Sequence, residues 1–131
     1  GEGEKKTLKL VAKYGDACNF HVGTRLEGYS PRLRTCYENR QERLTRKLAI
    51  LKEHCGQVGR SFDDIERTAL AAIKLAPEAM TSIEIIELCR ELAEMGFQQV
   101  IFNMPNDHEI SPLEIIGQEI IPVVADFKTK D

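Results

Sequence analysis

The chain contains no tryptophan, and aromatic residues make up only 6% of its 131 residues. Its formal net charge is −3, which gives no support for bulk attraction to nucleic acid or anionic lipid. No apolar run approaches the length of a bilayer span, and no signal-peptide pattern opens the chain. We therefore expect neither a nucleic-acid partner nor a membrane partner.

Cysteine is sparse and shows no CxxC spacing. The four cysteines lie far apart, each in an apolar or helical context: Cys18, Cys36, Cys55 and Cys89. This pattern favours reduced, buried thiols in the cytoplasm over a disulfide framework or a metal site. No histidine has a second histidine or a carboxylate at metal-ligand spacing, so we predict no metal.

Length and composition fit a single domain over residues 1–131, with 42% hydrophobic residues available for a core. Helix and strand signals alternate along the chain. We expect strands at 16–22, 65–75 and 97–104, and helices at 5–14, 31–55, 82–95 and 111–127.

Local signals mark several of these helices. Ser-Pro pairs at 30–31 and 111–112 resemble an N-cap followed by proline in the first turn. Thr81 and Glu84 have the spacing of a capping box. Pro122 is expected to bend or divide the last helix.

This order predicts a helix followed by three parallel strand–helix units with right-handed crossovers. Three such strands make an arc of sheet and not a closed barrel. Both edges of the arc would present unpaired backbone groups, and its inner face would lack a cover. The sequence therefore predicts either a piece of a larger fold or a partner that supplies the missing neighbour.

The opening residues combine a glycine-containing loop, 1–4, with the start of an amphipathic helix. The first turn of a helix leaves backbone N–H groups free and carries the positive end of the dipole, which suits a phosphate. The alternative interpretation is an ordinary frayed terminus with two solvated lysines.

Three passages resemble the luciferase-like flavin-dependent oxidoreductases and monooxygenases. They read GEGEKKTLKLVAKYGDACNF, KLAILKEHCGQVGRSFDDIERT and ELAEMGFQQVIFNMPNDHEISPLEIIGQEIIPVV, in collinear order over nearly the whole chain. The branch most similar to them uses the deazaflavin F-420 in place of FMN, although these motifs do not separate the branches. The resemblance implies a (β/α) TIM-type barrel with the cofactor at the carboxyl ends of its strands.

A whole barrel of this type needs at least about 200 residues. The resemblance therefore implies the C-terminal part of the barrel only, a half-barrel segment whose family chemistry is hydride transfer. It also implies the residues that would hold the cofactor: Gly3, Glu4, Lys5, Lys6, Thr7, Asn19 and Asn103. Asn19 and Asn103 are expected at the carboxyl ends of two strands, where each could instead cap a junction between strand and loop.

Other polar residues give weaker indications. His21 follows the first expected strand and could contact a ligand, whereas His108 is expected in solvent and His54 near a helix C-terminus. A run of arginines between 32 and 46 is interleaved with glutamates, which favours a solvated helix with local ion pairs over a nucleic-acid surface.

The sequence thus predicts a fragment or short relative of a flavin- or deazaflavin-dependent oxidoreductase, inactive when alone, with no catalytic residue that can be named. A second interpretation is a non-catalytic half-barrel module that is stabilised as a homodimer. A third is an unrelated small α/β ligand-binding protein with a complete fold.

Overall fold

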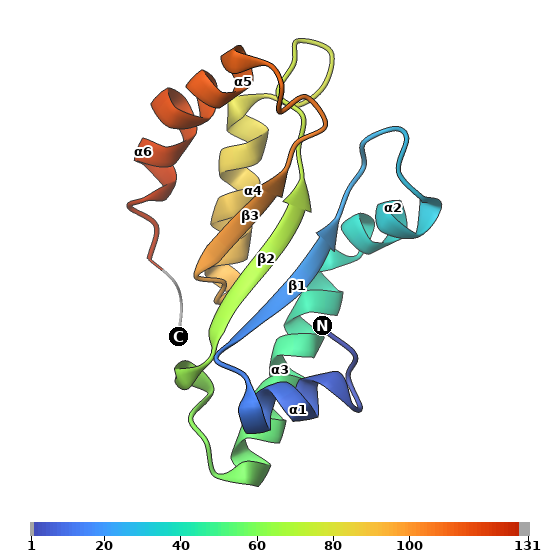
Figure 1. Cartoon of the computed structure of the whole chain (residues 1–131), viewed down its shortest axis with the longest axis vertical. Helices are drawn as coiled ribbons and strands as arrows, with labels where there is room; N and C mark the ends of the chain where they lie inside the picture. The colour runs from blue at the N-terminus through green and yellow to red at the C-terminus, as the bar shows by residue number, and fades with distance from the viewer. Residues whose placement is uncertain (1, 129–131) are drawn as a thin grey trace.

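A computed structural model describes residues 2–128 (Figure 1). The elements follow one another in this order: α1 (Thr7–Tyr14), β1 (Ala17–Gly23), α2 (Pro31–Glu38), α3 (Arg40–Val58), η1 (Phe62–Asp64), β2 (Glu66–Ala72), α4 (Ser82–Met95), β3 (Gln99–Asn103), α5 (Ile110–Ile115), η2 (Ile116–Ile120) and α6 (Ile121–Val124). Gly1, the first residue of the expected phosphate loop, lies outside the described residues.

The strands form one parallel sheet in the order β1-β2-β3. Phe20 pairs with Ala69, and Ala69 pairs with Val100. Helices α2 and α3 connect β1 to β2, and α4 connects β2 to β3. The prediction of three parallel strands in an α/β fold, with a helix in front, is confirmed.

One face of the sheet is packed against helices, and the main core lies there (Figure 1). Phe20 is fully buried, and its ring meets that of Phe97 edge to face, with 5.6 Å between centroids. Leu44 of α3 and Leu92 of α4 join the same cluster. Apolar stripes on these two helices therefore cover the side of the sheet that carries Cys18, Phe20 and Val22.

The opposite face of the sheet has no such cover. Burial alternates along β1, where Cys18, Phe20 and Val22 are buried while Ala17 and Asn19 are exposed. On β3 the exposed residues are Gln99, Ile101 and Asn103. The expected uncovered inner face is therefore present in the described part of the chain, and we call it the open sheet face.

The C-terminal helix, which comprises α5, η2 and α6, packs against α4 and β3 through a second apolar cluster. This cluster includes Ile85, Cys89 and Ile120. It is not one regular helix, because η2 is a π-helical turn in which the Ile121 N–H donates to the Ile116 carbonyl. Pro122 follows immediately and has no N–H to continue α-helical bonding. The expectation that the helix is divided near Pro122 is confirmed.

Several predicted helix boundaries differ from the structure. The helix expected over 31–55 is broken at Asn39, whose backbone angles (φ −103°, ψ 17°) separate α2 from α3. This break lets α3 turn its stripe into the core, whereas α2 has no buried residue. The last helix begins at Ile110 and not at the 111–112 pair, because proline is tolerated throughout a first turn.

Gly23 ends β1 at a register shift, with φ of +90°. A Cβ atom there would lie 2.5 Å from both the Leu33 carbonyl oxygen and the Tyr37 nitrogen. The chain therefore needs glycine here for two reasons, its backbone angle and the close approach of α2. Gly28 shares the positive φ (+86°) but faces open space, so it needs glycine for the first reason only.

This contrast gives a test of the packing between β1 and α2. Gly28→Ala is expected to lower the free energy of unfolding by about 1 kcal/mol, the cost of a left-handed alanine. Gly23→Ala should lower it by about 3 kcal/mol or more, because overpacking adds to that cost. Urea denaturation followed by circular dichroism measures both variants, and equal losses would contradict the packing described here.

Candidate functional site

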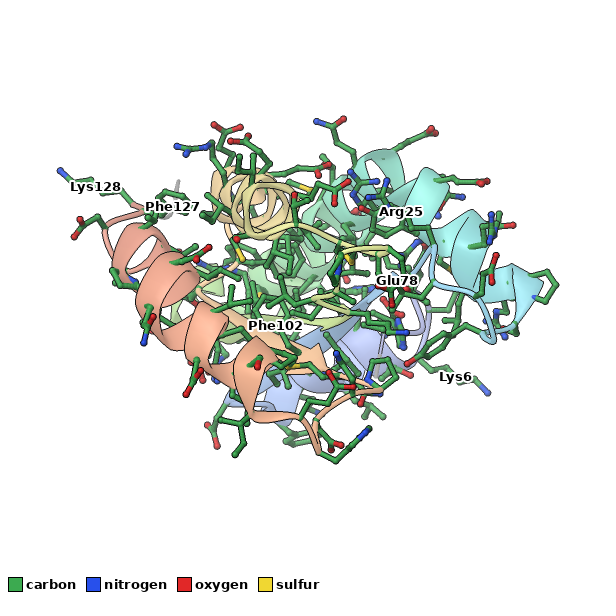
Figure 2. The ribbon with its side chains drawn as sticks, turned by 90° about the horizontal axis from the view of Figure 1, so that it is seen from above. Lys6, Arg25, Glu78, Phe102, Phe127 and Lys128 are labelled. Atoms are coloured by element: carbon green, nitrogen blue, oxygen red, sulfur yellow. The ribbon has the colours of Figure 1, made fainter. Side chains whose placement is uncertain are left out.

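A cleft of about 430 Å³ opens where the strands end at their carboxyl termini. Three loops form it, at 24–30, 73–81 and 104–109, each following one strand. In parallel α/β sheets ligands bind at this end, because the loops from neighbouring strands converge there. Figure 2 looks down on this end, and Arg25 and Glu78 from two of the loops lie near each other.

Buried hydrogen bonds hold the first of these loops in place. The Thr24 side chain is 2% exposed, and its hydroxyl donates to the Ala72 carbonyl at 3.3 Å while accepting from the Leu26 N–H at 3.1 Å. The third loop is fixed similarly, because Asn106 donates through Nδ2 to the Leu75 carbonyl at 3.2 Å. These bonds tie both loops to the β2 strand and to the segment that follows it.

Arg25 also contacts the start of α4. Its Nη2 donates to Glu84 Oε1 at 2.6 Å. Glu84 also completes the predicted capping box with Thr81, which is confirmed. The Thr81 backbone N–H and then Arg25 hold the pKa of the Glu84 carboxyl below its usual value, because both stabilise the ionised form.

The charges around the cleft are mixed. Arg25 and Lys74 supply positive charge, and Glu27 and Glu78 supply negative charge. Lys74 lies 4.0 Å from Glu78 as an exposed ion pair. An anionic group entering the cleft would therefore compete with carboxylates that already hold the cations.

Tyr29, Arg25 and Lys74 were missed from the sequence. The loops that carry them follow expected strands. The rule that ligands bind at the carboxyl ends of parallel strands therefore predicted the location of the cleft. No residue pattern in the loops marked these side chains.

The two asparagines of the predicted site lie on the open sheet face but at different heights. Asn103 is the last residue of β3, as predicted. Asn19 is only the third residue of β1, so its expected place at a carboxyl end is wrong. Its Oδ1 accepts from the Thr68 hydroxyl at 2.8 Å across the β1–β2 pair. Both β1 and the strand expected over 16–22 continue for at least three residues beyond Asn19.

His21 lies within β1, inside the strand expected over 16–22, so its expected place after that strand is wrong. Its Nδ1 accepts a hydrogen bond from the Gly23 N–H at 3.1 Å. The neutral ring therefore carries its proton on Nε2. His54 lies near the C-terminus of α3, as expected, and its Nε2 lies 3.1 Å from the carbonyl oxygen of Glu4 in the N-terminal loop.

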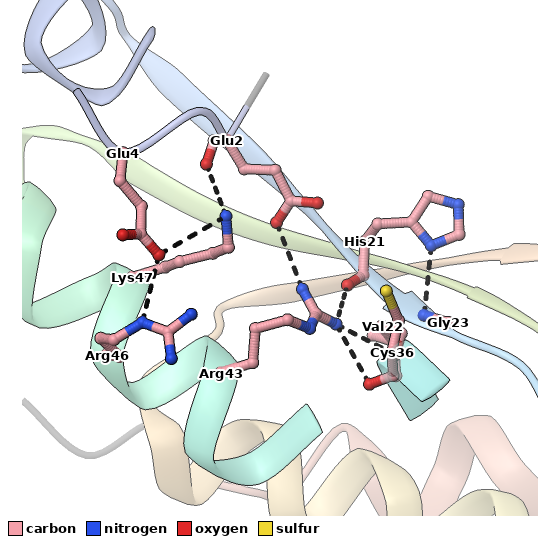
Figure 3. Close-up of polar contacts among 9 residues, drawn as sticks. All are labelled: Glu2, Glu4, His21, Val22, Gly23, Cys36, Arg43, Arg46 and Lys47. Carbon is pink, nitrogen blue, oxygen red and sulfur yellow. Dashed lines mark hydrogen bonds and ion pairs between the residues drawn. The ribbon is translucent and has the colours of Figure 1, made fainter. Parts of the chain in front are cut away.

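The predicted phosphate loop packs against α3 (Figure 3). Glu4 Oε1 lies 3.1 Å from Arg46 Nε and 4.0 Å from Lys47 Nζ, which also donates to the Glu2 carbonyl at 2.7 Å. Glu2 Oε2 lies 3.5 Å from Arg43 Nη1. The acidic side chains of this loop therefore hold α3.

The remaining loop residues are divided between two environments. The Leu8 N–H donates to the Gly3 carbonyl at 2.9 Å, and a Cβ at Gly3 would lie 2.9 Å from the Thr7 hydroxyl oxygen. Lys5 and Lys6 are exposed on a separate groove along α1. Among the described residues, none of the predicted cofactor residues lines the carboxyl-end cleft.

The arginines of the basic segment form structural contacts between elements. Arg40 donates from Nε and Nη2 to Glu91 of α4, at 3.1 and 2.9 Å, and stacks 4.2 Å from the centre of the Tyr37 ring. Arg43 donates from Nη2 to the carbonyls of His21, Val22 and Cys36. Ion pairing was predicted within this helix, but Arg40 pairs with a different helix.

Within residues 2–128 no group of three or more acidic, histidine or cysteine side chains could hold a metal ion. Over the same residues, no helix is both long enough and apolar enough to cross a membrane. Burial raises the pKa of the Cys89 thiol to about 11, and raises those of Cys18 and Cys55 as well.

Comparison with protein-family models, with curated proteins and with solved structures gave no match to this chain.

The Glu84 carboxylate gives a pH-dependent test of the loop arrangement. Glu84→Ala is expected to lower the free energy of unfolding by about 1 kcal/mol at pH 7, through loss of the capping box. Because the folded-state pKa is lowered, this contribution is complete above the unfolded-state value of about 4.3 and disappears as the pH falls through the folded-state value.

Denaturation at pH 7 and at pH 3 measures this difference. The matched control is Glu94→Ala, an exposed glutamate of the same helix, which should stay within about 0.5 kcal/mol of the parent. A cost for Glu84→Ala that is the same at both pH values would contradict the role of the ionised carboxylate.

Proposed function

We propose that this chain forms an arc of a (β/α) barrel that binds a phosphate-bearing redox cofactor, FMN or the deazaflavin F-420, and belongs to an oxidoreductase. The observation that carries the proposal is the open sheet face. In the described residues, helices cover one face of the three parallel strands, and only strand side chains project from the other. The wall of a (β/α) barrel has this arrangement.

The side chains on the open sheet face support this view through their order across the strands. Asn19, Thr68 and Gln99 are neighbours in register, as are His21, Leu70 and Ile101. The first set is polar and lies nearer the start of the strands. In a barrel such sets would form successive layers of the interior.

The cleft residues fit one part of such a cofactor. Arg25 and Lys74 could hold phosphate oxygens through charge-assisted hydrogen bonds, and the Tyr29 ring could pack on an aromatic ring system. When bound, the cofactor supplies the hydride chemistry, and the protein orients it and excludes water. The predicted residues Gly3 to Thr7 remain the alternative place for the phosphate.

One arc supplies only part of the wall around a ring system. We therefore expect the isolated chain to bind either cofactor with a dissociation constant above about 100 μM. We expect no turnover by this chain alone.

Titrating the chain into FMN, and separately into F-420, while following cofactor fluorescence tests this proposal. Arg25→Ala and Lys74→Ala should weaken the residual binding, whereas Lys52→Ala, an exposed lysine of α3, should not. If Lys5→Ala or Lys6→Ala weakens binding instead, the phosphate is assigned to the N-terminal segment that contains Gly3 to Thr7. No binding of either cofactor at millimolar concentration would contradict the proposal.

A second candidate function is a non-catalytic module in which two copies cover each other's open sheet faces. The specific observation is Ile101, a large apolar side chain of β3 that is 42% exposed on that face. Leu70 lies beside it in register and is half-buried. Pairing would remove this surface from water and protect the sheet.

Size-exclusion chromatography with light scattering tests the second candidate. The chain should elute as a dimer, and Ile101→Lys should shift it to a monomer because the charge would be buried in the interface. Ile83→Lys is the matched control, since Ile83 is 73% exposed on α4 and away from the sheet. A well-folded monomer from the unchanged chain would rule this function out.

A further inference from the structure

A cavity of about 270 Å³ lies between α4, β3 and the C-terminal helix, which comprises α5, η2 and α6. It shares no lining residue with the carboxyl-end cleft. We propose that this cavity binds a neutral, largely apolar small molecule, of the size of a bicyclic aromatic compound or a medium-chain alcohol. The proposal does not depend on the barrel or on a redox cofactor.

Its walls are apolar on three sides. Cys89 and Ala93 come from α4, and Phe97 and Phe102 come from β3 and the residues before it. Isoleucines of the C-terminal helix close the third side. Pockets that bind small molecules have this composition, with a few polar groups that orient the ligand.

The cavity lies at the junction of the two apolar clusters. Phe97 belongs to the main core, and Cys89 belongs to the cluster beneath the C-terminal helix. Between them, Val100 and Phe102 are only half-buried (Figure 2 labels Phe102). The helix therefore leaves part of the β3 surface uncovered, and a ligand would cover it.

The π-helical turn shapes this wall. The bond from the Ile121 N–H to the Ile116 carbonyl spans five residues, so the turn is wider than an α-helical turn. Both residues joined by this bond, Ile116 and Ile121, line the cavity. Single π-turns inside helices are often found at functional sites.

The lining carries no charged side chain among the described residues. At the rim, the Arg90 guanidinium lies 4.5 Å from the centre of the Phe127 ring and pairs with Glu87 at 3.6 Å. Because Arg90 is already held by Glu87 and the Phe127 ring, an ionised ligand group inside the cavity would lose its water and find no charged partner in the lining. A neutral ligand is therefore favoured.

One end of the cavity is polar. Gln98 lines it, and the side-chain Oε1 of Gln98 accepts from the Arg67 N–H at 2.9 Å. This bond fixes the side-chain carbonyl of Gln98. The two N–H groups of the same side-chain amide point away from Arg67. A hydroxyl or carbonyl group of the ligand could accept from them.

The cavity is partly open to solvent, so its volume indicates the bulk of the ligand portion that it can hold. A dry cavity of about 150 Å³ lined by similar residues accepts benzene, according to a well-studied engineered case. A volume of about 270 Å³ therefore has room for two fused rings or an aliphatic chain of comparable bulk.

Titration with N-phenyl-1-naphthylamine, a neutral probe that fluoresces in apolar sites, tests this proposal. The chain has no tryptophan to interfere with the signal. We expect saturable binding at one site per chain. Ala93→Phe should weaken it by about tenfold or more, because the new ring occupies the cavity. Ala125→Phe, an exposed position of the same end of the chain, is the matched control and should leave binding unchanged.

Competition identifies the ligand class. Decanol should displace the probe, and decanoate of the same chain length should do so about tenfold less well or worse, because its charge has no partner. Circular dichroism and thermal melting check the fold of each variant. If Ala93→Phe does not fold, Ile121→Tyr narrows the mouth from a position that is 54% exposed and adds no tryptophan.

Three results would overturn the proposal. They are an absence of saturable probe binding, equal affinity in the parent and the folded cavity variants, and an equal loss in Ala125→Phe. Preferential displacement by decanoate would overturn the assignment of a neutral ligand.

Discussion

The structure depends on the burial of one face of a short parallel sheet. Phe20, Ala69 and their neighbours pack under α3 and α4, and this cluster brings the three strands and both helices together. Parallel sheets are almost always covered on both faces, because their crossover helices lie on the outside and another layer lies within. Here both connections place their helices on the same side, so the open sheet face is a direct consequence of the topology.

Two buried arginines hold backbone carbonyls around the sheet. Arg67 is 2% exposed and donates to the carbonyls of Gly96, Phe62 and Ile65. Arg43 does the same for the carbonyls at the end of β1. A guanidinium has five donors in one plane, so it can satisfy several carbonyls that have no strand beside them. The N-terminal loop that contains Glu2 and Glu4 then supplies Glu2 to Arg43, which explains why this loop is held against α3 (Figure 3).

The two functions proposed for the open sheet face differ only in what covers it. A barrel would cover it with further strands and leave the carboxyl-end cleft for a cofactor, whereas a dimer would cover it with a second copy. The apolar cavity beneath the C-terminal helix is independent of both, because a separate cluster and a π-helical turn form it. The same chain can therefore carry a ligand site on the outside of the sheet whatever covers the inside.

The sequence by itself determined the order and direction of the elements. Alternating apolar runs, the Thr81–Glu84 capping box and Pro122 are local signals, and local backbone chemistry decides what they form. The predicted functional residues depended instead on a family resemblance, which nothing in the structure tests. Asn19 was misplaced although the expected strand ended within one residue of β1, which pairs with β2 as far as Gly23.

Only the tertiary structure decided where the chain bends and what converges. The break at Asn39 follows from the need of α3 to bury Leu44 and its stripe, which no local signal encodes. The meeting of Arg25 with Glu84 joins residues 59 positions apart. The cavity arises from incomplete packing between two clusters. Such features depend on the distances between packed elements. Those distances result from the whole fold and cannot be inferred from any local stretch of the sequence.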